Sequence, residues 1–339
     1  MQNKYAYKIL VSFLAVIGFL QIFTFSKKIA DINFDNSLFY AAKSHPIPKN
    51  VTFCNEEVPL NSRDIKERLD KEIIKNTYWH SSILLFYKRA GKYFPVIEPI
   101  LRKNNIPDDF KYLAIAESGL KNVVSPAGAK GFWQFMEKTG REFGLEINKE
   151  VDERYNLVKS TQAACEYLNE AHKKFGSWTL VAASYNMGMY GLEKNLKRQK
   201  VNNYYDLLLN SETARYVFRI VTFKLILENP KHFGFNLNEN DRYAPIKFKT
   251  VKIDSSITNF TDFAIKQGVN YKILKIGNPW LRQKYLKNPL KKIYNLKIPI
   301  EGFNVYTDLN KNIIDSNFIY NKDSINLKKV VNSDSIKNQ

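Results

Sequence analysis

Cysteine and histidine are scarce in this chain of 339 residues, which has two cysteines and four histidines. Cys54 and Cys165 are too few for a disulfide framework, and the sequence leaves open whether they are bridged or free. Neither cysteine has a histidine close to it in sequence, so a thiol nucleophile is not expected. The histidines form no ligand-spaced cluster, so the sequence predicts no metal ion, and no other motif indicates a cofactor.

Acidic residues are also few: 33 Asp and Glu against 52 Lys and Arg give a net charge of +19. This charge favours a polyanionic partner, such as nucleic acid, an anionic membrane surface or an acidic cell-wall polymer. A lysine-rich, solvated surface without a specific partner is the alternative. The sequence has no zinc-finger spacing, RNP-type aromatic motif or compact arginine cluster, so nucleic acid is not the expected partner.

Residues 1–28 have the pattern of an export signal, in which two lysines precede the uncharged stretch Ile9–Phe25 and two follow it. The stretch is long for the apolar part of a cleaved signal and short for a membrane-spanning helix. An N-terminal membrane anchor is favoured over a cleaved signal peptide, and a buried helix of a soluble protein is the third possibility. We therefore expect the protein in the periplasm or cell envelope, tethered to the membrane by this segment.

The remaining chain divides by composition. Residues 29–60 are polar and contain several prolines, which predicts a linker. Residues 61–235 have apolar side chains at helical spacing, and between residues 61 and 228 no alternating strand pattern is found. Pro107-Asp108-Asp109 predicts the start of a helix that ends near Glu117 or Ser118, before Gly119.

The C-terminal part changes character. Lys247–Ile253 and Ile293–Ile298 alternate as strands do, with two short helices expected between them, Phe260–Lys266 and Tyr271–Ile276. Residues 245–300 are thus predicted to form a β-α-α-β module, and the Asn-, Lys- and Ser-rich residues 308–339 a disordered tail. The expected fold class is mainly α, with this small module at the C-terminal side.

The segment Lys111–Met136 concentrates the features that suggest chemistry. Glu117 ends an apolar run, and a loop of small residues and glycines follows it. Apolar surroundings raise the pKa of a carboxyl group, so Glu117 can hold a proton at neutral pH and donate it to a leaving oxygen. Glycosidic bonds are cleaved by acid catalysis of this kind. The alternative is a helix-terminal glutamate that turns outward and binds a backbone group.

Two later segments can complete such a site. Tyr185-Asn186-Met187-Gly188 offers a phenol and an amide that can hydrogen-bond a sugar or orient an acid. A buried tyrosine next to a helix-capping asparagine is the alternative. Glu212–Val217 opens the last core helix and offers Tyr216, which by itself is weak evidence.

Together these segments resemble the lytic transglycosylases of the goose-lysozyme-like type, and among them the membrane-bound murein lytic transglycosylases of the D type. The resemblance covers about residues 60–230 and includes the lead-in KNNIPDDFKYLAIAESGL. The matching segments, in this order, are AESGL (116–120), SPAGAKGFWQFMEKTGREFGL (125–145), VDERYN (151–156), SYNMG (184–188) and ETARYV (212–217).

The resemblance implies a lysozyme-like α-helical fold and cleavage of the β-1,4 bond between N-acetylmuramic acid and N-acetylglucosamine in peptidoglycan, with 1,6-anhydro ends as products. Glu117 would be the only catalytic acid and base. It would protonate the glycosidic oxygen and then accept the proton of the muramoyl C6 hydroxyl as that oxygen closes on C1. Peptidoglycan glycan strands are the partner that this implies.

The family's substrate-binding positions map onto Ser118, Gly131, Gln134, Tyr185, Asn186 and Tyr216. Gly131 and Gln134 match a Gly-x-x-Gln motif that lines the saccharide cleft. Asn186 belongs to a Tyr-Asn pair that binds the acetamido sugar or stabilises an oxocarbenium-like state. Tyr216 matches a tyrosine near the catalytic glutamate, and Ser118 follows that glutamate and supports local geometry.

The sequence departs from the family in two places. Met187 replaces a small residue, and Ser184 stands where alanine is common, which concerns the shape of the cleft rather than the acid. A hydrolase with two catalytic acids would need a second carboxylate, for which Asp152 and Glu153 are the nearest candidates. In the family they belong to a structural segment, and that interpretation is preferred.

The C-terminal module resembles a degenerate LysM module, a glycan-binding fold common beside this catalytic domain, in the stretch FAIKQGVNYKILKIGNPWL. A structural appendage that only packs on the catalytic domain is the alternative. Two functions compete with that of a transglycosylase: a muramidase that hydrolyses the same bond, and a catalytically silent peptidoglycan-binding protein.

Overall fold

The computed structural model describes residues 43–300 together with Ile17 and Gln21. The chain divides into two units, residues 1–44 and residues 45–339, and the fold described below belongs to the second unit. The predicted signal or anchor at residues 1–28, apart from those two positions, and the predicted disordered tail at residues 308–339 lie outside the described residues. Among the residues described, no helix is both long and apolar enough to cross a membrane.

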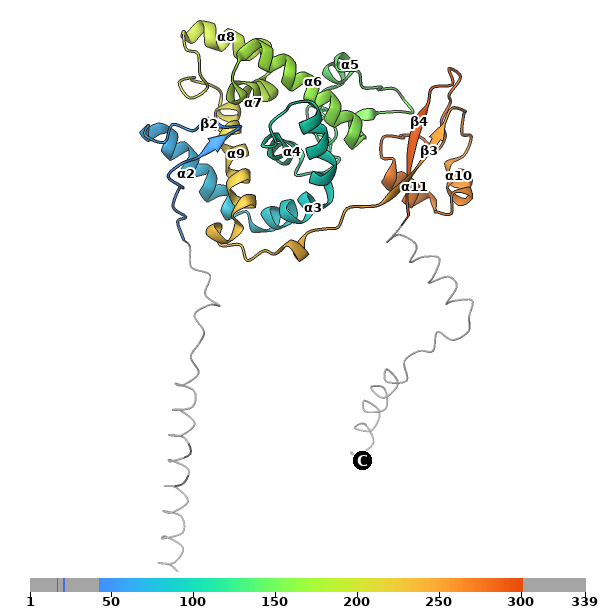
Figure 1. Cartoon of the computed structure of the whole chain (residues 1–339), viewed down its shortest axis with the longest axis horizontal. Coiled ribbons are helices and arrows are strands. Elements are labelled where there is room, and N and C mark those ends of the chain that lie inside the picture. Colours follow the sequence, from blue (N-terminus) through green and yellow to red (C-terminus); the bar gives the residue numbers. More distant parts are fainter. Residues whose placement is uncertain (1–16, 18–20, 22–42, 301–339) are drawn as a thin grey trace, which may run out of the picture. The chain divides into compact units, whose positions relative to one another are not determined.

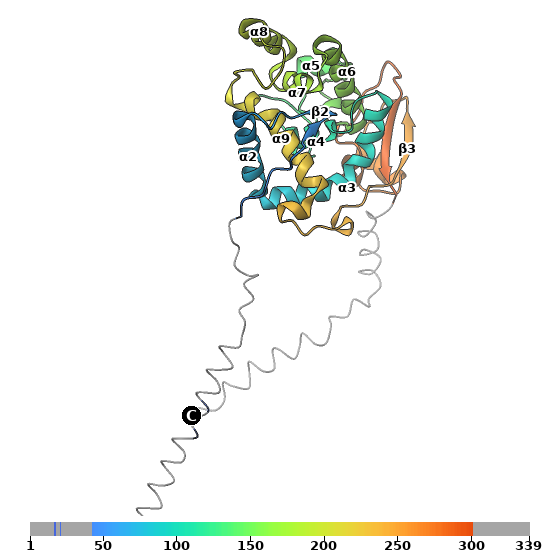
Figure 2. The same ribbon diagram turned by 60° about the vertical axis from the view of Figure 1, so that its left-hand side comes forward.

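Helices dominate the first part of this unit, as the periodicity predicted. Helix α9 packs against α2, α4 and α7, while α3 packs against α6, so that apolar faces meet in one core (Figures 1 and 2). The helices are α2 (Arg63–Thr77), α3 (His80–Lys103), α4 (Phe110–Ser118), α5 (Glu137–Glu142), α6 (Leu157–Phe175), α7 (Trp178–Met187), α8 (Met189–Gln199) and α9 (Ser211–Glu228), with short 3-10 turns η2 (Glu153–Tyr155), η3 (Pro230–Phe233) and η4 (Glu239–Asp241).

Helix α4 ends where the sequence predicted. Gly119 adopts φ +58 directly after Ser118, and its N–H donates to the carbonyl of Ile115. A Cβ at Gly119 would lie 2.6 Å from the ring of Phe86, so both the left-handed backbone and the close packing require glycine there. This stop places Glu117 in the last turn of the helix.

The prediction of a linker over residues 29–60 is wrong for its last part, residues 51–58. Strands β1 (Thr52–Phe53) and β2 (Glu56–Glu57) pair antiparallel, and Val51, Phe53 and Val58 are buried in the helical core. We call residues 51–58 the N-terminal arm. The polar composition of the arm conceals these core side chains, because they alternate with the exposed residues Thr52, Asn55 and Glu57.

The arm holds the starts of two helices. The N–H of Cys54 donates to a carboxylate oxygen of Asp109, the N-cap residue of α4, at 2.7 Å. The carboxylate of Glu56 accepts from the N–H groups of Trp178 and Thr179 at 2.5 and 2.9 Å, at the start of α7. A carboxylate there satisfies donors that have no partner within the helix and interacts favourably with the helix dipole.

Both cysteines are buried and free, which answers the question left open by the sequence. Burial is the main cause that raises the pKa of each thiol far above its usual range, to about 12 for Cys165. Both groups are therefore uncharged and unreactive core side chains.

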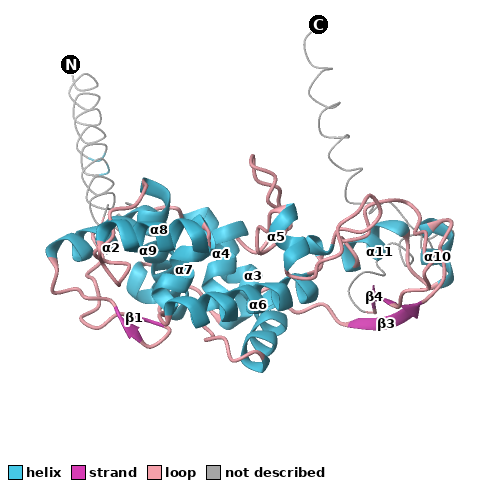
Figure 3. Cartoon of the chain, turned by 90° about the horizontal axis from the view of Figure 1, so that it is seen from above, coloured by secondary structure: helices cyan, strands magenta, loops and turns pink. Residues whose placement is uncertain are grey.

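The C-terminal module has the expected order of elements, β3 (Phe248–Ile253), α10 (Phe260–Lys266), α11 (Tyr271–Gly277) and β4 (Tyr294–Pro299). The strands pair antiparallel from Phe248 opposite Pro299 to Ile253 opposite Tyr294, with the two helices packed beside them (Figure 3). Phe260, Leu274 and Leu296 lie in its own small core. The β-α-α-β pattern predicted from alternation is confirmed.

Residues 146–155 of the helical domain join this module. Val151 and Tyr155 belong to the module's hydrophobic cluster, and the guanidinium of Arg282 lies 4.2 Å from the centre of the Tyr155 ring. Three hydrogen-bonded contacts accompany them: Asp152 N–H to the Trp280 carbonyl at 2.9 Å, Arg282 N–H to the Glu150 carbonyl at 2.7 Å, and the Tyr294 hydroxyl to the Glu146 carboxylate at 3.1 and 3.2 Å.

The cap on α7 makes a prediction about stability. Replacing Glu56 by alanine leaves the first N–H groups of α7 without their acceptor, so the free energy of unfolding should fall by about 1–2 kcal/mol in urea denaturation. Glu57→Ala is the matched control, since Glu57 is exposed on the same strand. Equal losses in the two variants would show that the cap does not stabilise the fold.

Candidate active site

Glu117 lies in the last turn of α4, whose other residues are mostly buried. Its side chain remains partly exposed. The hydroxyl of Tyr216, from the buried face of α9, donates a hydrogen bond to Glu117 Oε1. The packing of α4 against α9 brings these two residues together, although 99 positions separate them.

The surroundings of Glu117 favour its protonated form. Desolvation by the protein atoms around the carboxyl is the largest cause and raises its pKa from 4.5 to about 7. The hydrogen bond from Tyr216 and the charge of Arg219 act in the opposite direction, and the nearby carboxylate of Glu212 adds to the rise. A group with this pKa can both donate and accept a proton near neutral pH.

Tyr185 and Asn186 are held in place by hydrogen bonds from two sides. The Tyr185 hydroxyl donates to the carbonyl of Trp133 at 2.8 Å. The amide of Asn186 donates to Glu212 at 3.3 Å, and its carbonyl accepts from the Thr213 hydroxyl at 2.8 Å. The first turn of α9 therefore orients the amide, while α7 supplies it. Burial raises the pKa of Tyr185 well above its usual range, and Glu117 contributes to this rise.

Gly131 and Gln134 stabilise the loop that follows Glu117. A Cβ at Gly131, where φ is +84, would collide with the carbonyl of Arg154. The amide of Gln134 donates to the carbonyls of Gly131 at 2.7 Å and Val123 at 3.2 Å. The close approach of Gly131 to Arg154 sets the loop against this residue, and the Gln134 amide closes the loop on itself. Among the described residues, no hydrogen bond joins Gly131 or Gln134 to Glu117.

Ser118 points into the protein rather than toward solvent. It is buried, its hydroxyl donates to the carbonyl of Ala114 at 3.1 Å, and it accepts from the N–H of Lys121 at 3.4 Å. These bonds tie the end of α4 to the turn that follows it. The position of Ser118 suits local support of the backbone.

Asp152 and Glu153, the sequence candidates for a second carboxylate, are engaged elsewhere. Both oxygens of Asp152 accept from the guanidinium of Arg154, at 2.9 and 2.8 Å, and Glu153 accepts from the N–H of Glu146 at 2.9 Å. The structure thus supports the interpretation of a structural segment. The carboxylate whose charge acts on Glu117 is instead Glu212.

Two residues near Glu117 were missed in the sequence. In the sequence, Glu212 stands only as the first residue of the segment that offers Tyr216, and Arg219 is not singled out. The guanidinium of Arg219 lies 5.4 Å from the centre of the Tyr216 ring, and its buried Nε has no hydrogen-bond partner among the described residues. Spacing of i, i+4 and i+7 from Glu212 through Tyr216 to Arg219 on one helix is the signal that could have found them.

A metal site is not evident in the part of the chain that is described. Within it, no group of three or more His, Cys, Asp or Glu side chains is arranged to hold a metal ion.

The site is a glutamate that can be protonated, held between helices. Comparison with protein families shows which known domains this chain resembles. Residues 94–208 match the Transglycosylase SLT domain, and residues 249–302 match the Soluble lytic transglycosylase C-terminal LysM-like domain. Residues 94–208 are thus similar to a transglycosylase SLT domain and residues 249–302 to a LysM-like module, in the order that the sequence resemblance implied.

Individual relatives agree with this assignment. Over 190 residues the chain is 34% identical to Membrane-bound lytic murein transglycosylase D of Escherichia coli. This alignment covers 54% of this chain and 41% of the relative. Over 102 residues it is 29% identical to a Putative tributyltin chloride resistance protein of Alteromonas sp. This second alignment covers 30% of this chain and 49% of that relative. The chain thus spans less than half the length of these curated relatives.

Among solved structures, the lytic transglycosylase Slt of Pseudomonas aeruginosa aligns with 45% of this chain and 26% of its own. The TM-score is 0.33 and the sequence identity is 16%, values too low to support a conclusion.

The hydrogen bond from Tyr216 predicts the direction of a pKa change. Tyr216→Phe removes a donor that stabilises the charged carboxylate, so the pKa of Glu117 should rise above its value of about 7. NMR titration of a 13C-labelled glutamate carboxyl measures it. Tyr112→Phe is the control on α4, because that hydroxyl donates to Glu228 and not to Glu117. An unchanged or lowered pKa in Tyr216→Phe would contradict the assigned role.

The raised pKa also predicts a pH-dependent stability. Between pH 4.5 and about 7 the folded protein keeps the Glu117 proton that the unfolded chain releases, so stability falls as pH rises through this window. Glu117→Gln has no proton to release at this position, so its stability does not fall in this way. The difference in free energy of unfolding between Glu117→Gln and the wild type should therefore change by about 3 kcal/mol in favour of the variant as pH rises across the window.

Chemical denaturation at a series of pH values tests this expectation. Glu142→Gln, which changes an exposed glutamate on α5, should differ from the wild type by an amount that does not depend on pH. A pH-independent difference for Glu117→Gln as well would show that the carboxyl is ordinarily ionised in the folded protein.

Proposed function

We propose that this protein is a peptidoglycan lytic transglycosylase in which Glu117 is the single general acid and base. The observation that carries the proposal is the desolvated carboxyl of Glu117, with a pKa raised to about 7 and a hydrogen bond from Tyr216, within an SLT domain. The substrate is the β-1,4 bond between N-acetylmuramic acid and N-acetylglucosamine.

The reaction needs two proton transfers at one carboxyl group. Protonated Glu117 first donates its proton to the glycosidic oxygen, and the bond from that oxygen to C1 of muramic acid breaks. The resulting carboxylate then accepts the proton of the C6 hydroxyl as the C6 oxygen forms a bond to C1. The product is a 1,6-anhydro sugar, water is not consumed, and Glu117 ends protonated as it began. A pKa near neutrality suits both steps.

Neighbouring side chains have separate tasks in this mechanism. Tyr216 orients the carboxyl and stabilises its charged form between the two steps. Arg219 adds positive charge on the same side, and Asn186, oriented by Glu212 and Thr213, keeps one amide hydrogen available for the sugar's acetamido group or ring. The amide hydrogen can orient the sugar, and Arg219 and Tyr216 stabilise the carboxylate form of Glu117, whose negative charge in turn stabilises the positive charge that develops at C1.

Hydrolysis of the same bond is the second candidate, favoured by one observation. The carboxylate of Glu212 is close enough to act on the pKa of Glu117, so it is a possible base for water. Its bond to the Asn186 amide argues for a supporting role instead. Under the transglycosylase proposal, Glu212→Gln should still release anhydro products.

Envelope location is part of the proposal. A relative is described as membrane-bound, and residues 1–28 have two lysines on each side of an uncharged stretch. We place the protein in the periplasm, tethered by this segment. The net charge of +19 suits a cell-wall polymer whose peptides carry carboxylates.

Digestion of purified sacculi, followed by mass spectrometry of the soluble products, tests the proposal. The wild type should release muropeptides with 1,6-anhydro ends, and Glu117→Gln should lower the rate by about a hundredfold or more, as removal of a general acid does. Glu142→Gln should keep the full rate. Products with only reducing muramic ends would show that the protein is a muramidase. Equal rates for Glu117→Gln and the wild type would show that Glu117 is not catalytic and would favour a peptidoglycan-binding protein.

A further inference from the structure

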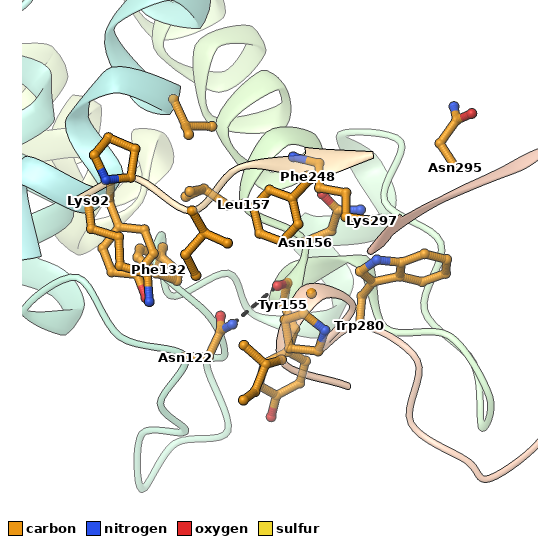
Figure 4. Close-up of a pocket in the computed structure, with 17 residues that line it drawn as sticks. Lys92, Asn122, Phe132, Tyr155, Asn156, Leu157, Phe248, Trp280, Asn295 and Lys297 are labelled. Atoms are coloured by element: carbon orange, nitrogen blue, oxygen red, sulfur yellow. Dashed lines mark hydrogen bonds between the residues drawn. The ribbon is translucent and has the colours of Figure 1, made fainter. Parts of the chain in front are cut away.

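A cavity of about 150 Å³ lies where the helical domain meets the C-terminal module. Lys297, Phe248 and Trp280 line it from the module, and Tyr155 and Phe132 from the helical domain (Figure 4). Glu117, Tyr185, Asn186 and Tyr216 are not among the residues that line this cavity. Its walls combine aromatic rings, asparagine side chains and two lysines.

The charge of the lining has one sign. Lys92 and Lys297 are among the residues that line the cavity, and no aspartate or glutamate is. In the described part of the protein, neither ammonium group takes part in a hydrogen bond or an ion pair. Each instead lies near an aromatic ring, Lys297 at 5.5 Å from the centre of Phe248 and Lys92 at 5.1 Å from that of Tyr93. Both side chains are partly buried, and burial lowers the pKa of Lys297.

Two unpaired cations without an acid between them are best stabilised by an anion. The volume restricts which anion fits, since a cavity of about 150 Å³ holds a group about the size of benzene. A sugar of a glycan strand is larger than that. A terminal amino acid with a small side chain and a free carboxylate has the right size and charge.

A second, more open hollow of about 670 Å³ lies next to the cavity and shares three of its lining residues, Asn156, Trp280 and Asn295. This second hollow has both signs of charge, with Lys292 and Glu146 among its residues. It is the neighbouring surface that the rest of a longer peptide would meet if its end occupied the first cavity.

We propose that this junction cavity binds the terminal carboxylate of a peptide, such as the D-alanyl end of a peptidoglycan stem, at a site separate from Glu117. The choice of peptide rests on the proposed function. Phe132 lines the cavity and is adjacent to Gly131, so an occupant of the cavity contacts the loop that follows Glu117. The protein thereby recognises the peptide and the glycan of one polymer through different surfaces.

Calorimetry with the full chain and N-acetyl-D-alanyl-D-alanine tests the proposal. The wild type should bind this peptide, and the same peptide with an amidated C-terminus should bind at least about tenfold more weakly, because a charge-assisted hydrogen bond is lost. Lys297→Met should cause a similar loss for the acid peptide. Lys252→Met is the matched control, since Lys252 is exposed on the paired strand β3 and does not line the cavity.

Lys92→Met is the second variant, and it keeps the test decisive if Lys297→Met unfolds. Absence of binding, equal binding of the acid and the amide, or equal losses in Lys252→Met and the cavity variants would overturn the proposal. Equally tight binding of sodium acetate would overturn the assignment to a peptide.

The experiment also separates this proposal from the proposed function. Glu117→Gln should bind the peptide as the wild type does while losing sacculus digestion. Digestion without peptide binding refutes the cavity alone, and peptide binding without digestion by the wild type refutes the transglycosylase alone.

Discussion

The buried ion pair between Asp152 and Arg154 is the interaction on which the arrangement of the site and the C-terminal module depends. Arg154 is 2% exposed, and its guanidinium donates to both oxygens of Asp152 and to the carbonyl of Phe135. Burial by itself would raise the pKa of Asp152, but Arg154 and Lys130 hold it below its usual range. Because a buried charge without its partner is costly, the segment is held in one conformation. Gly131 packs on the Arg154 carbonyl on one side, and the Asp152 N–H binds the module on the other.

The candidate site is assembled from the ends of helices. Helix α4 supplies Glu117 in its last turn, α7 supplies Asn186 near its end, and α9 crosses between them with Tyr216. Each group is oriented by a partner on a different helix, so its position depends on packing of the core and not on local backbone preference. This explains why the acid can be desolvated and still partly exposed: the apolar core surrounds it on the protein side only.

Local signals in the sequence predicted the elements well, and long-range contacts explain what they missed. Gly119 and Gly176 mark helix ends because a left-handed residue is a property of one position. The sequence predicts a linker at residues 51–58, because the burial of Phe53 depends on partners that are distant in sequence. One of them is Phe110, whose ring centre lies 5.4 Å from that of Phe53. Helical spacing places Glu212 on the same face of α9 as Tyr216, but the effect of Glu212 on Glu117 also depends on how α9 crosses α4, which the local sequence does not encode. Sequence resemblance named Tyr216, but its hydrogen bond to Glu117 required the fold.

The N-terminal arm has a mechanical consequence. Through Asp109 it holds the start of α4, whose last turn contains Glu117. Through Glu56 it holds the start of α7, whose last turn contains Tyr185 and Asn186. Tension applied to the chain from the side of residue 1 therefore reaches the starts of both helices through these carboxylates, and the core through Val51, Phe53 and Val58. The acid and the amide lie near the other ends of the same two helices, so a load on the arm acts on the elements that set the spacing between them.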